Sequence, residues 1–219
     1  MRQLVKVWDV PTRVFHWVLV LLFAGMWFSG NQSGNWMEWH LRGGVALAAL
    51  LLYRVIWGVL GSETARFSDF IKGPQAIRRY LKGELKESEQ PGHNPMGGWM
   101  VLVVLLALGT QVVTGLFSAD VNAYLYDGPL AGSISSELAE QMNSWHRLNF
   151  NLLLALVGLH LTAIVLYRVL KKQNLVKAML TGYKSIEGEA PTLYFAPTVI
   201  ALVTLVVACG AVYFVLTRF

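Results

Sequence analysis

Five long apolar segments constrain the fold of this chain more than any other feature. Each is long enough to cross a hydrocarbon core about 30 Å thick, and they cover residues 14–30, 39–61, 97–117, 145–167 and 196–216. Hydrophobic residues make up 55% of the 219 residues and charged residues 14%, against about 25% charged in soluble domains. The sequence therefore predicts an all-α integral membrane protein in contact with lipid.

The first apolar segment also has some features of a signal peptide. Arg2, Lys6 and Arg13 precede it, and it ends in a small-residue stretch. It contains His16 and two tryptophans, however, and no A-x-A-like cleavage site follows it. We expect this segment to remain as a membrane span.

Basic residues predict the topology. Segments 31–38 and 118–144 contain no Lys or Arg, whereas the loops between spans two and three and between spans four and five are basic: Arg66, Lys72, Arg78, Arg79, Lys82, Lys86, Arg168, Lys171, Lys172, Lys177 and Lys184. The positive-inside rule places the N-terminus and both basic loops in the cytoplasm and the C-terminus on the outer side of the membrane. The sequence pI of 9.4 then needs no nucleic acid partner.

The two basic loops contain segments that mix apolar residues with cations. Residues 69–82 and 175–184 are compatible with short helices in the membrane interface. An ordinary solvated loop, with Gly73 and Pro74 as a turn, explains the first segment equally well.

Four histidines lie at matched depths in the expected spans. His16 and His160 fall toward the cytoplasmic side, and His40 and His146 toward the outer side. His146 and His160 are fourteen residues apart, which is about 21 Å along one helical face. Ionisable residues are costly in a membrane, so each pair is a candidate for clamping one haem iron through both axial positions.

Zinc binding and a purely structural role account for these histidines less well. Zinc usually requires four protein ligands, or three and water, and two isolated histidine pairs do not supply them. Each histidine alone could be a hydrogen-bonded core residue. The single cysteine, Cys209, excludes a disulfide and a Cys-x-x-Cys-His attachment within the chain, so any haem would be held without covalent links.

Small and basic residues close to the outer histidines are candidates for further cofactor contacts. Gly43 and Gly44 share a helical face with His40, where they would either admit a porphyrin or serve helix packing. Arg42 and Arg147 go against the charge bias of the outer side, and we expect them to bind haem propionates. Arg13 is the corresponding candidate inside, although Arg13, Arg54 and Arg168 also fit as cytoplasmic anchors.

The fifth histidine, His93, lies in a turn-rich stretch just before the third apolar segment. It has no partner at matched depth. An interfacial polar residue is the first interpretation, and a proton acceptor near a quinone is the second.

Motifs on three expected spans carry a family resemblance. The segment V-W-D-V-P-T-R-V-F-H-W from Val7, the motif G-H-N-P from Gly92, and W-H-R from Trp145 followed by G-L-H from Gly158 resemble the bacterial cytochrome b561 family, in its branch of hydrogenase-type cytochrome b subunits. The likeness covers about residues 4–184. It implies a four-helix bundle with two b-type haems, ligated by His16, His40, His146 and His160, that passes electrons between quinone and a redox partner.

This resemblance suggests a division of the chain into two parts. Residues 1–184 would form the di-haem domain, and residues 185–219 would add a fifth transmembrane helix for membrane anchoring or partner docking. The implied role is that of an electron-transfer subunit in a quinone-linked oxidoreductase.

Three functions remain open from the sequence. The first is electron transfer between quinone and a periplasmic c-type cytochrome or dehydrogenase subunit, which acidic residues on the outer side would dock: Glu38, Asp120, Asp127, Glu137 and Glu140. The second is a superoxide oxidase, an activity that the resemblance also permits, although an acidic surface repels an anionic substrate. The third is a non-redox membrane anchor or transporter.

Overall fold

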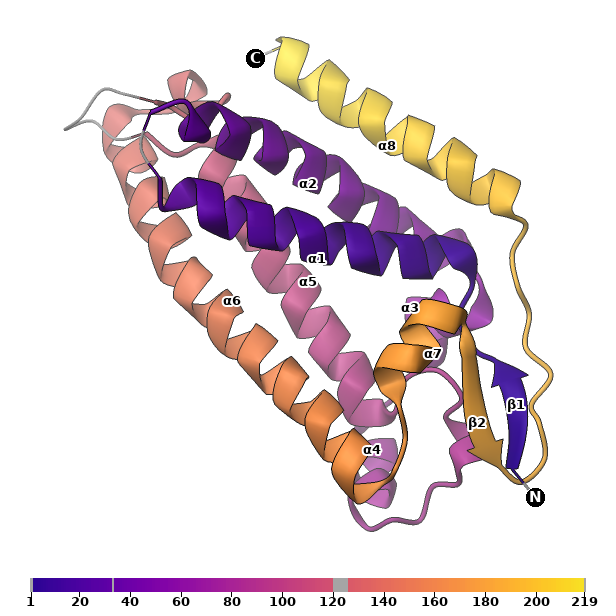
Figure 1. Ribbon diagram of the computed structural model, residues 1–219. Coiled ribbons are helices and arrows are strands. Elements are labelled where there is room, and N and C mark those ends of the chain that lie inside the picture. Colours follow the sequence, from indigo (N-terminus) through magenta and orange to yellow (C-terminus); the bar gives the residue numbers. More distant parts are fainter. Residues whose placement is uncertain (1, 33, 120–125, 219) are drawn as a thin grey trace. The chain divides into compact units, whose positions relative to one another are not determined.

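The computed structural model describes residues 2–32, 34–119 and 126–218. Within them, five helices are long and apolar enough to cross a membrane. They are α1 (Val10–Gly30), α2 (Trp36–Leu60), α5 (Pro95–Leu116), α6 (Ser136–Leu170) and α8 (Thr198–Arg218), coloured from indigo to yellow in Figure 1. Each contains most of one predicted apolar segment, so the chain is a helical, multi-pass membrane protein, as predicted.

Short elements connect the spans, mostly in the two basic loops. They comprise the helices α3 (Phe67–Phe70), α4 (Pro74–Leu81) and α7 (Leu175–Thr181), the 3-10 turns η1 (Glu63–Ala65), η2 (Glu87–Glu89) and η3 (Ala131–Ser133), and the strands β1 (Arg2–Lys6) and β2 (Tyr183–Glu187). Residues 69–82 and 175–184 therefore each contain a short helix, as one interpretation predicted, and the position of these helices in the membrane interface remains a prediction. Pro74 opens α4 at a position where helices tolerate proline.

The chain divides into two compact units. The first unit comprises Met1–Phe15, Arg54–Val103 and Val157–Thr204, and the second comprises His16–Tyr53, Val104–Leu156 and Leu205–Phe219. Both units contain parts of α1, α2, α5, α6 and α8, because the division cuts across the helices.

An apolar core joins four helices in the second unit. Its buried residues are Leu47 and Leu51 of α2, Ala107 and Leu108 of α5, and Leu153 of α6. Leu19 and Phe23 of α1 pack against this core, and the Phe23 ring stacks on Phe150 with centroids 6.2 Å apart. Burial of these side chains fixes the faces that the four helices turn toward one another.

The first unit contains a two-stranded antiparallel sheet that the sequence did not predict. β1 and β2 pair with Arg2 opposite Glu187 and Lys6 opposite Tyr183. Gly182, between α7 and β2, has a φ of +89° and would bring a Cβ within 2.9 Å of the Trp8 carbonyl oxygen. The strands are five residues each and lie near opposite ends of the chain, so a local pattern was too short to reveal the pairing.

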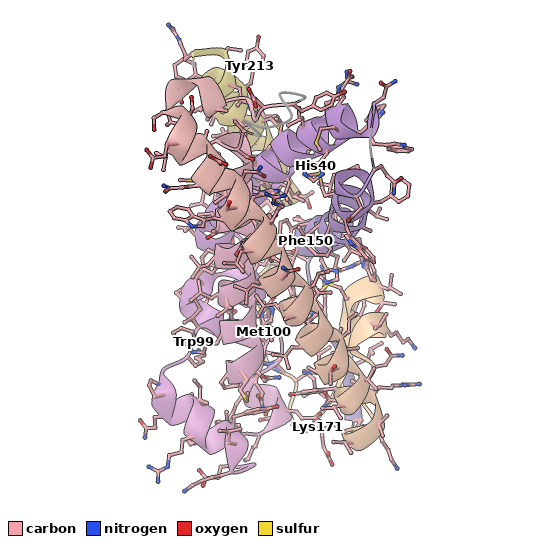
Figure 2. All side chains as sticks on the ribbon, turned by 90° about the vertical axis from the view of Figure 1, so that its left-hand side faces the viewer. His40, Trp99, Met100, Phe150, Lys171 and Tyr213 are labelled. Atoms are coloured by element: carbon pink, nitrogen blue, oxygen red, sulfur yellow. The ribbon has the colours of Figure 1, made fainter. Side chains whose placement is uncertain are left out.

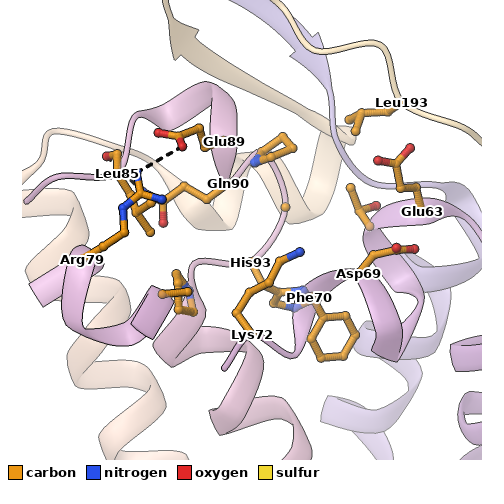
Figure 3. A pocket seen from close by; sticks show the side chains of 15 residues that line it. Glu63, Asp69, Phe70, Lys72, Arg79, Leu85, Glu89, Gln90, His93 and Leu193 are labelled. Carbon is orange, nitrogen blue, oxygen red and sulfur yellow. Dashed lines mark hydrogen bonds and ion pairs between the residues drawn. The ribbon is translucent and has the colours of Figure 1, made fainter. Parts of the chain in front are cut away.

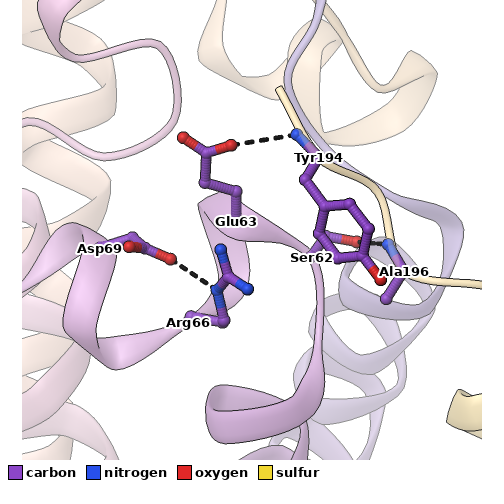
Figure 4. A network of polar contacts seen from close by, with 6 residues as sticks. All are labelled: Ser62, Glu63, Arg66, Asp69, Tyr194 and Ala196. Carbon is purple, nitrogen blue, oxygen red and sulfur yellow. Dashed lines mark hydrogen bonds and ion pairs between the residues drawn. The ribbon is translucent and has the colours of Figure 1, made fainter. Parts of the chain in front are cut away.

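A polar network joins the loop after α2 to the segment that leads into α8 (Figure 4). The Glu63 carboxylate accepts a hydrogen bond from the Tyr194 backbone N–H at 3.0 Å, and the Glu63 N–H donates to the Tyr194 carbonyl at 3.0 Å. The Ser62 hydroxyl accepts from the Ala196 N–H at 3.1 Å. Because α8 begins soon after Ala196, these backbone contacts fix the start of the fifth span.

Another set of contacts joins α4 to the end of α6. The hydroxyls of Tyr80 and Tyr167 lie 2.5 Å apart, and the Asn94 amide donates to the Tyr167 hydroxyl at 2.5 Å. The Lys171 ammonium lies 4.9 Å from both tyrosine ring centres, at the end of α6 in Figure 2. These contacts hold the amphipathic helix α4 in place within the first unit.

Helix α6 begins earlier than its apolar segment indicates. It starts at Ser136, where the Ser135 hydroxyl accepts from the Leu138 N–H at 3.4 Å. Ala139 is buried against Ala119 and Ala131. The first turns of α6 are polar helix, which a search for apolar segments does not detect, and they carry the exposed residues Glu137 and Glu140.

Candidate functional site

The structure brings His40 and His146, the histidines that we expect on the outer side, together in the second unit. The rings of His40, labelled in Figure 2, and His146 have centroids 6.1 Å apart and planes at 79°. Two imidazoles that ligate one ion from opposite sides have ring centres about 6 Å apart, because a metal–nitrogen bond is about 2 Å long and the nitrogen lies about 1 Å from the ring centre. The separation therefore fits an iron held between them.

The C-terminal end of α1 forms a binding surface, or seat, for His40. Its Nδ1 lies 3.1 Å from the Met26 carbonyl oxygen and 3.3 Å from the Ser29 hydroxyl. The face of the ring lies on Gly30, where an added Cβ would be 2.9 Å from Cε1. Any larger residue at position 30 would push the ring away.

The C-terminal end of α5 forms a matching seat for His146. Its Nδ1 lies 2.9 Å from the Gln111 carbonyl oxygen and 3.3 Å from the Thr114 hydroxyl. A Cβ added to Gly115 would be 2.8 Å from Cε1. Both seats thus consist of a carbonyl, a hydroxyl three residues later, and a glycine after the hydroxyl.

The hydrogen bonds of the two seats determine which ring nitrogen carries the proton. The Ser29 hydroxyl donates to the Gly25 carbonyl at 2.8 Å, and the Thr114 hydroxyl donates to the Thr110 carbonyl at 2.7 Å. Each hydroxyl therefore offers only lone pairs to the imidazole, so Nδ1 of both histidines must be the donor. This assignment from the network leaves Nε2 unprotonated, as in a histidine that ligates a metal.

Gln111 and Asn149 complete the surroundings of His146. The Asn149 amide donates to Gln111 Oε1 at 2.7 Å and to the Ala107 carbonyl at 2.9 Å. This leaves the Gln111 amide N–H to face His146 Nε2, at 3.1 Å. The contact agrees with a lone pair on that nitrogen, which the Gln111 amide occupies in this structure and would release to a haem iron.

The two inner histidines belong to different units. His16 lies in α1 within the second unit, next to Trp17 with ring centroids 5.1 Å apart. His160 lies in α6 within the first unit and is exposed. Their pairing on a second iron remains a prediction.

The candidate arginines have different environments. Arg42 forms an ion pair with Glu38 at 3.3 Å and lies over the Trp39 ring at 5.2 Å, and Arg147 is exposed. Arg13 donates to the Thr181 carbonyl at 3.2 Å and packs against Gly182. These contacts join α1 to the turn between α7 and β2. Propionate binding by these three residues remains a prediction.

Gly43 and Gly44 lie against α1. A Cβ at Gly43 would be 2.5 Å from the Met26 sulfur, and one at Gly44 would be 3.7 Å from the Met26 methyl carbon. The contact illustrates the helix-packing interpretation of these glycines, and a porphyrin contact remains a prediction.

Sequence reasoning missed the seats of the outer histidines. Ser29-Gly30 and Thr114-Gly115 each lie near the end of an apolar segment, at the depth expected for His40 and His146. The repeated hydroxyl-glycine pair was a detectable signal. Its role in holding a histidine can be recognised only when the neighbouring helix is known, and hydrophobic periodicity does not predict which helices are neighbours.

His93 packs between two aromatic rings in the first unit. Its ring centroid lies 4.7 Å from that of Trp8 and 4.6 Å from that of Phe70. It borders a cavity of about 320 Å³ that Lys72 and Phe70 also line (Figure 3). Burial, with the nearby positive charges of Arg54 and Lys184, lowers the pKa of His93 to about 3. A group with this pKa is a weak proton acceptor near neutral pH, which favours a structural role.

Other metal centres have no obvious ligands in the described ranges. Within residues 2–32, 34–119 and 126–218, no group of three or more His, Cys, Asp or Glu side chains could hold a metal ion. The paired histidines are the relevant arrangement for a haem iron, which takes only its axial ligands from the protein.

Comparisons with known proteins identify the family of the chain. The family model for prokaryotic cytochrome b561 matches residues 7–182. A probable Ni/Fe-hydrogenase B-type cytochrome subunit of Rhizobium leguminosarum bv. viciae is 26% identical, with 83% of this chain and 89% of the relative covered. The corresponding Bradyrhizobium diazoefficiens subunit is 24% identical over 83% and 86%.

A relative with lower sequence identity has the same kind of name. The probable Ni/Fe-hydrogenase 1 B-type cytochrome subunit of Escherichia coli K12 is 22% identical, with 82% of this chain and 90% of the relative covered. No solved structure matches the chain significantly. Because the family model matches well over half of its length, this chain belongs to the prokaryotic cytochrome b561 family, and it is a haem-binding membrane protein of electron transport.

Proposed function

We propose that the chain is a di-haem cytochrome b that carries electrons between the quinone pool and a hydrogenase-like or c-type cytochrome partner at the periplasmic face of the inner membrane. The observation that carries this proposal is the seated pair His40 and His146, with ring centroids 6.1 Å apart. The names of the relatives support a hydrogenase-like partner.

In this proposal the protein binds, orients and insulates its cofactors. His40 and His146 hold the outer haem, and His16 and His160 hold the inner one. Bound haem supplies one-electron redox chemistry. With two protein ligands for each iron, no coordination position would be left open for a substrate, and the apolar helices would exclude water from the cofactor sites.

The support for an inner haem comes from α6. It carries both His146 and His160, yet only 6% of its most apolar window is buried, against 44% for α2. A helix with so much uncovered surface has room for flat cofactors as well as lipid. The spacing of fourteen residues places the two imidazoles on one face, about 21 Å apart.

Acidic residues support docking of the partner on the outer side. Glu38, Asp127, Glu137 and Glu140 are exposed in the second unit, and Asp120 lies outside the described residues. Their charges would steer a partner that presents basic residues around its own redox centre.

Substitution of single histidines tests the proposal. His146→Ala should lose the outer haem and His160→Ala the inner one, each variant retaining about half of the wild-type haem. Haem content by the pyridine haemochrome assay and a redox titration of each purified variant measure this. His93→Gln is the matched control and should retain all haem. Full haem content in both alanine variants would contradict the proposed ligands.

A further inference from the structure

The cavity of about 320 Å³ beside His93 lies where a membrane span begins, within the first unit (Figure 3). Pro95 lines the cavity and is the first residue of α5. One turn later Trp99, labelled in Figure 2, is 40% exposed, and its indole N–H donates to the Lys72 carbonyl at 2.9 Å. Exposed tryptophans of spanning helices gather at the level of the lipid headgroups. This level is therefore the one at which the cavity lies.

Two residues of the cavity wall have a buried polar atom that lacks a hydrogen-bond partner among the described residues. The atoms are Gln90 Oε1 and His93 Nδ1. The Gln90 amide nitrogen donates to the Leu85 carbonyl at 3.5 Å, which identifies Oε1 as the acceptor that is left over. Buried polar groups are nearly always hydrogen-bonded, and a cavity of this volume has room for a small ligand. A ligand that completes the site must therefore bring an N–H or O–H donor to Gln90.

The cavity wall carries charges of both signs. Its charged residues are the acids Glu63, Asp69 and Glu89 and the bases Lys72 and Arg79. Arg79 is paired with Glu89 at 3.5 Å, whereas Lys72 is exposed and belongs to none of the ion pairs in the described part of the chain. Lysine binds phosphate groups as a point charge. A ligand with a cationic and an anionic group fits this wall better than a ligand with one sign of charge.

The headgroup of an aminophospholipid has this combination of groups. Its ammonium has three N–H donors, one of which Gln90 Oε1 can accept, and its phosphate is an anion for Lys72. A choline headgroup has the same charges but no N–H, and a glycerol headgroup has no cation. The location of the cavity beside the start of α5 agrees with a ligand that comes from the membrane.

We propose that this cavity binds the phosphoethanolamine headgroup of an aminophospholipid, with its ammonium at Gln90 Oε1 and its phosphate at Lys72. Leu193, in the segment that leads into α8, also lines the cavity. A bound lipid would therefore join the start of α5 to the approach of the fifth span. The site uses none of the proposed haem ligands, so the inference does not depend on the di-haem function.

Lipid titrations of the purified, haem-loaded protein test this site without any substitution. Native mass spectrometry gives the dissociation constant of each lipid. Phosphatidylethanolamine should bind about tenfold to a hundredfold more tightly than phosphatidylcholine with the same acyl chains, because the methylated ammonium leaves Gln90 Oε1 without a donor. Equal dissociation constants for these two lipids would overturn the inference. Equally tight binding of phosphatidylglycerol, which has no ammonium, would also overturn it.

Two substitutions separate the parts of the headgroup. Gln90→Leu removes the acceptor and should abolish most of the preference for phosphatidylethanolamine over phosphatidylcholine. Lys72→Gln removes the charge at the phosphate, which both lipids carry, and should weaken both by a similar factor of roughly three to ten.

Helix α4 provides the matched controls. Gln75 and Arg78 are exposed and lie outside the cavity wall, so Gln75→Leu and Arg78→Gln should leave both dissociation constants unchanged. An unchanged lipid preference in a folded Gln90→Leu would overturn the inference. Weakening in Arg78→Gln equal to that in Lys72→Gln would overturn it as well, because it would indicate a general attraction to basic residues.

Free O-phosphoethanolamine distinguishes a membrane lipid from a soluble ligand of the same chemistry. It carries the ammonium and the phosphate but no acyl chains, so it should compete with phosphatidylethanolamine only at a concentration at least a hundredfold higher, roughly. Competition at equal concentrations would overturn the assignment to a lipid, because the cavity would then bind a soluble amine.

Discussion

His93 is kept neutral by its surroundings. Its ring lies between Trp8 and Phe70, and burial together with Arg54, Lys184 and His160 lowers its pKa to about 3. In the unfolded chain the pKa returns to about 6.5. Between these two values the unfolded state binds one proton more than the folded state, so the folded state loses stability as the pH falls.

This residue predicts a specific acid sensitivity. The contribution of His93 to the free energy of unfolding should fall by up to about 1.4 kcal/mol per pH unit below about pH 6.5. His93→Gln has no such group, so its unfolding temperature in detergent should fall less between about pH 7.5 and pH 5 than that of the wild type. Equal falls in the two proteins would contradict the buried neutral state of His93.

At the scale of elements, α1 and α5 perform the same task for their neighbours α2 and α6. Each presents a carbonyl, a hydroxyl and a glycine to one outer histidine. The close approach needs glycine because the imidazole lies directly on the backbone. Helix α1 thus orients the imidazole of His40 on α2, and helix α5 orients that of His146 on α6.

Alanine at the seat glycines tests this arrangement. Gly30→Ala and Gly115→Ala would place a Cβ 2.9 Å and 2.8 Å from the rings of His40 and His146. We expect either change to displace the ring, at a cost of about 1–3 kcal/mol, and to reduce or alter the outer haem signal in electron paramagnetic resonance spectra.

The same helices provide matched controls. Cβ atoms at Gly25 of α1 and Gly109 of α5 would meet nothing within 4 Å. Gly25→Ala and Gly109→Ala should therefore retain the wild-type haem spectrum, since alanine only favours the helix. Seat variants that behave like these controls would show that the glycines have no role in holding the histidines.

The sequence predicts elements well where one physical cause dominates. The five spans follow from apolar length alone. The ligand role of His40 and His146, inferred from the cost of imidazoles at membrane depth, stays a prediction. The start of α6 at Ser136 and the pairing of β1 with β2 were missed. Both depend on contacts with distant residues, such as Ala139 with Ala119. The seat of His146 was missed for the same reason, because it needs α5 as a neighbour.

At the scale of the whole molecule, the proposed function requires redox centres toward both sides of the membrane. The second unit supplies His40 and His146 with a geometry that fits one iron. The first unit supplies His160. A single haem would leave a transmembrane electron path incomplete, so the number of haems decides whether this chain carries electrons across the bilayer.

The haem content of the purified, fully loaded wild-type chain tests this central claim most directly. The pyridine haemochrome assay combined with quantitative amino-acid analysis gives the ratio of haem to protein. We predict two haems b per chain, both low-spin in the dithionite-reduced spectrum because each iron has two imidazole ligands. One haem per chain, or none, would contradict the account.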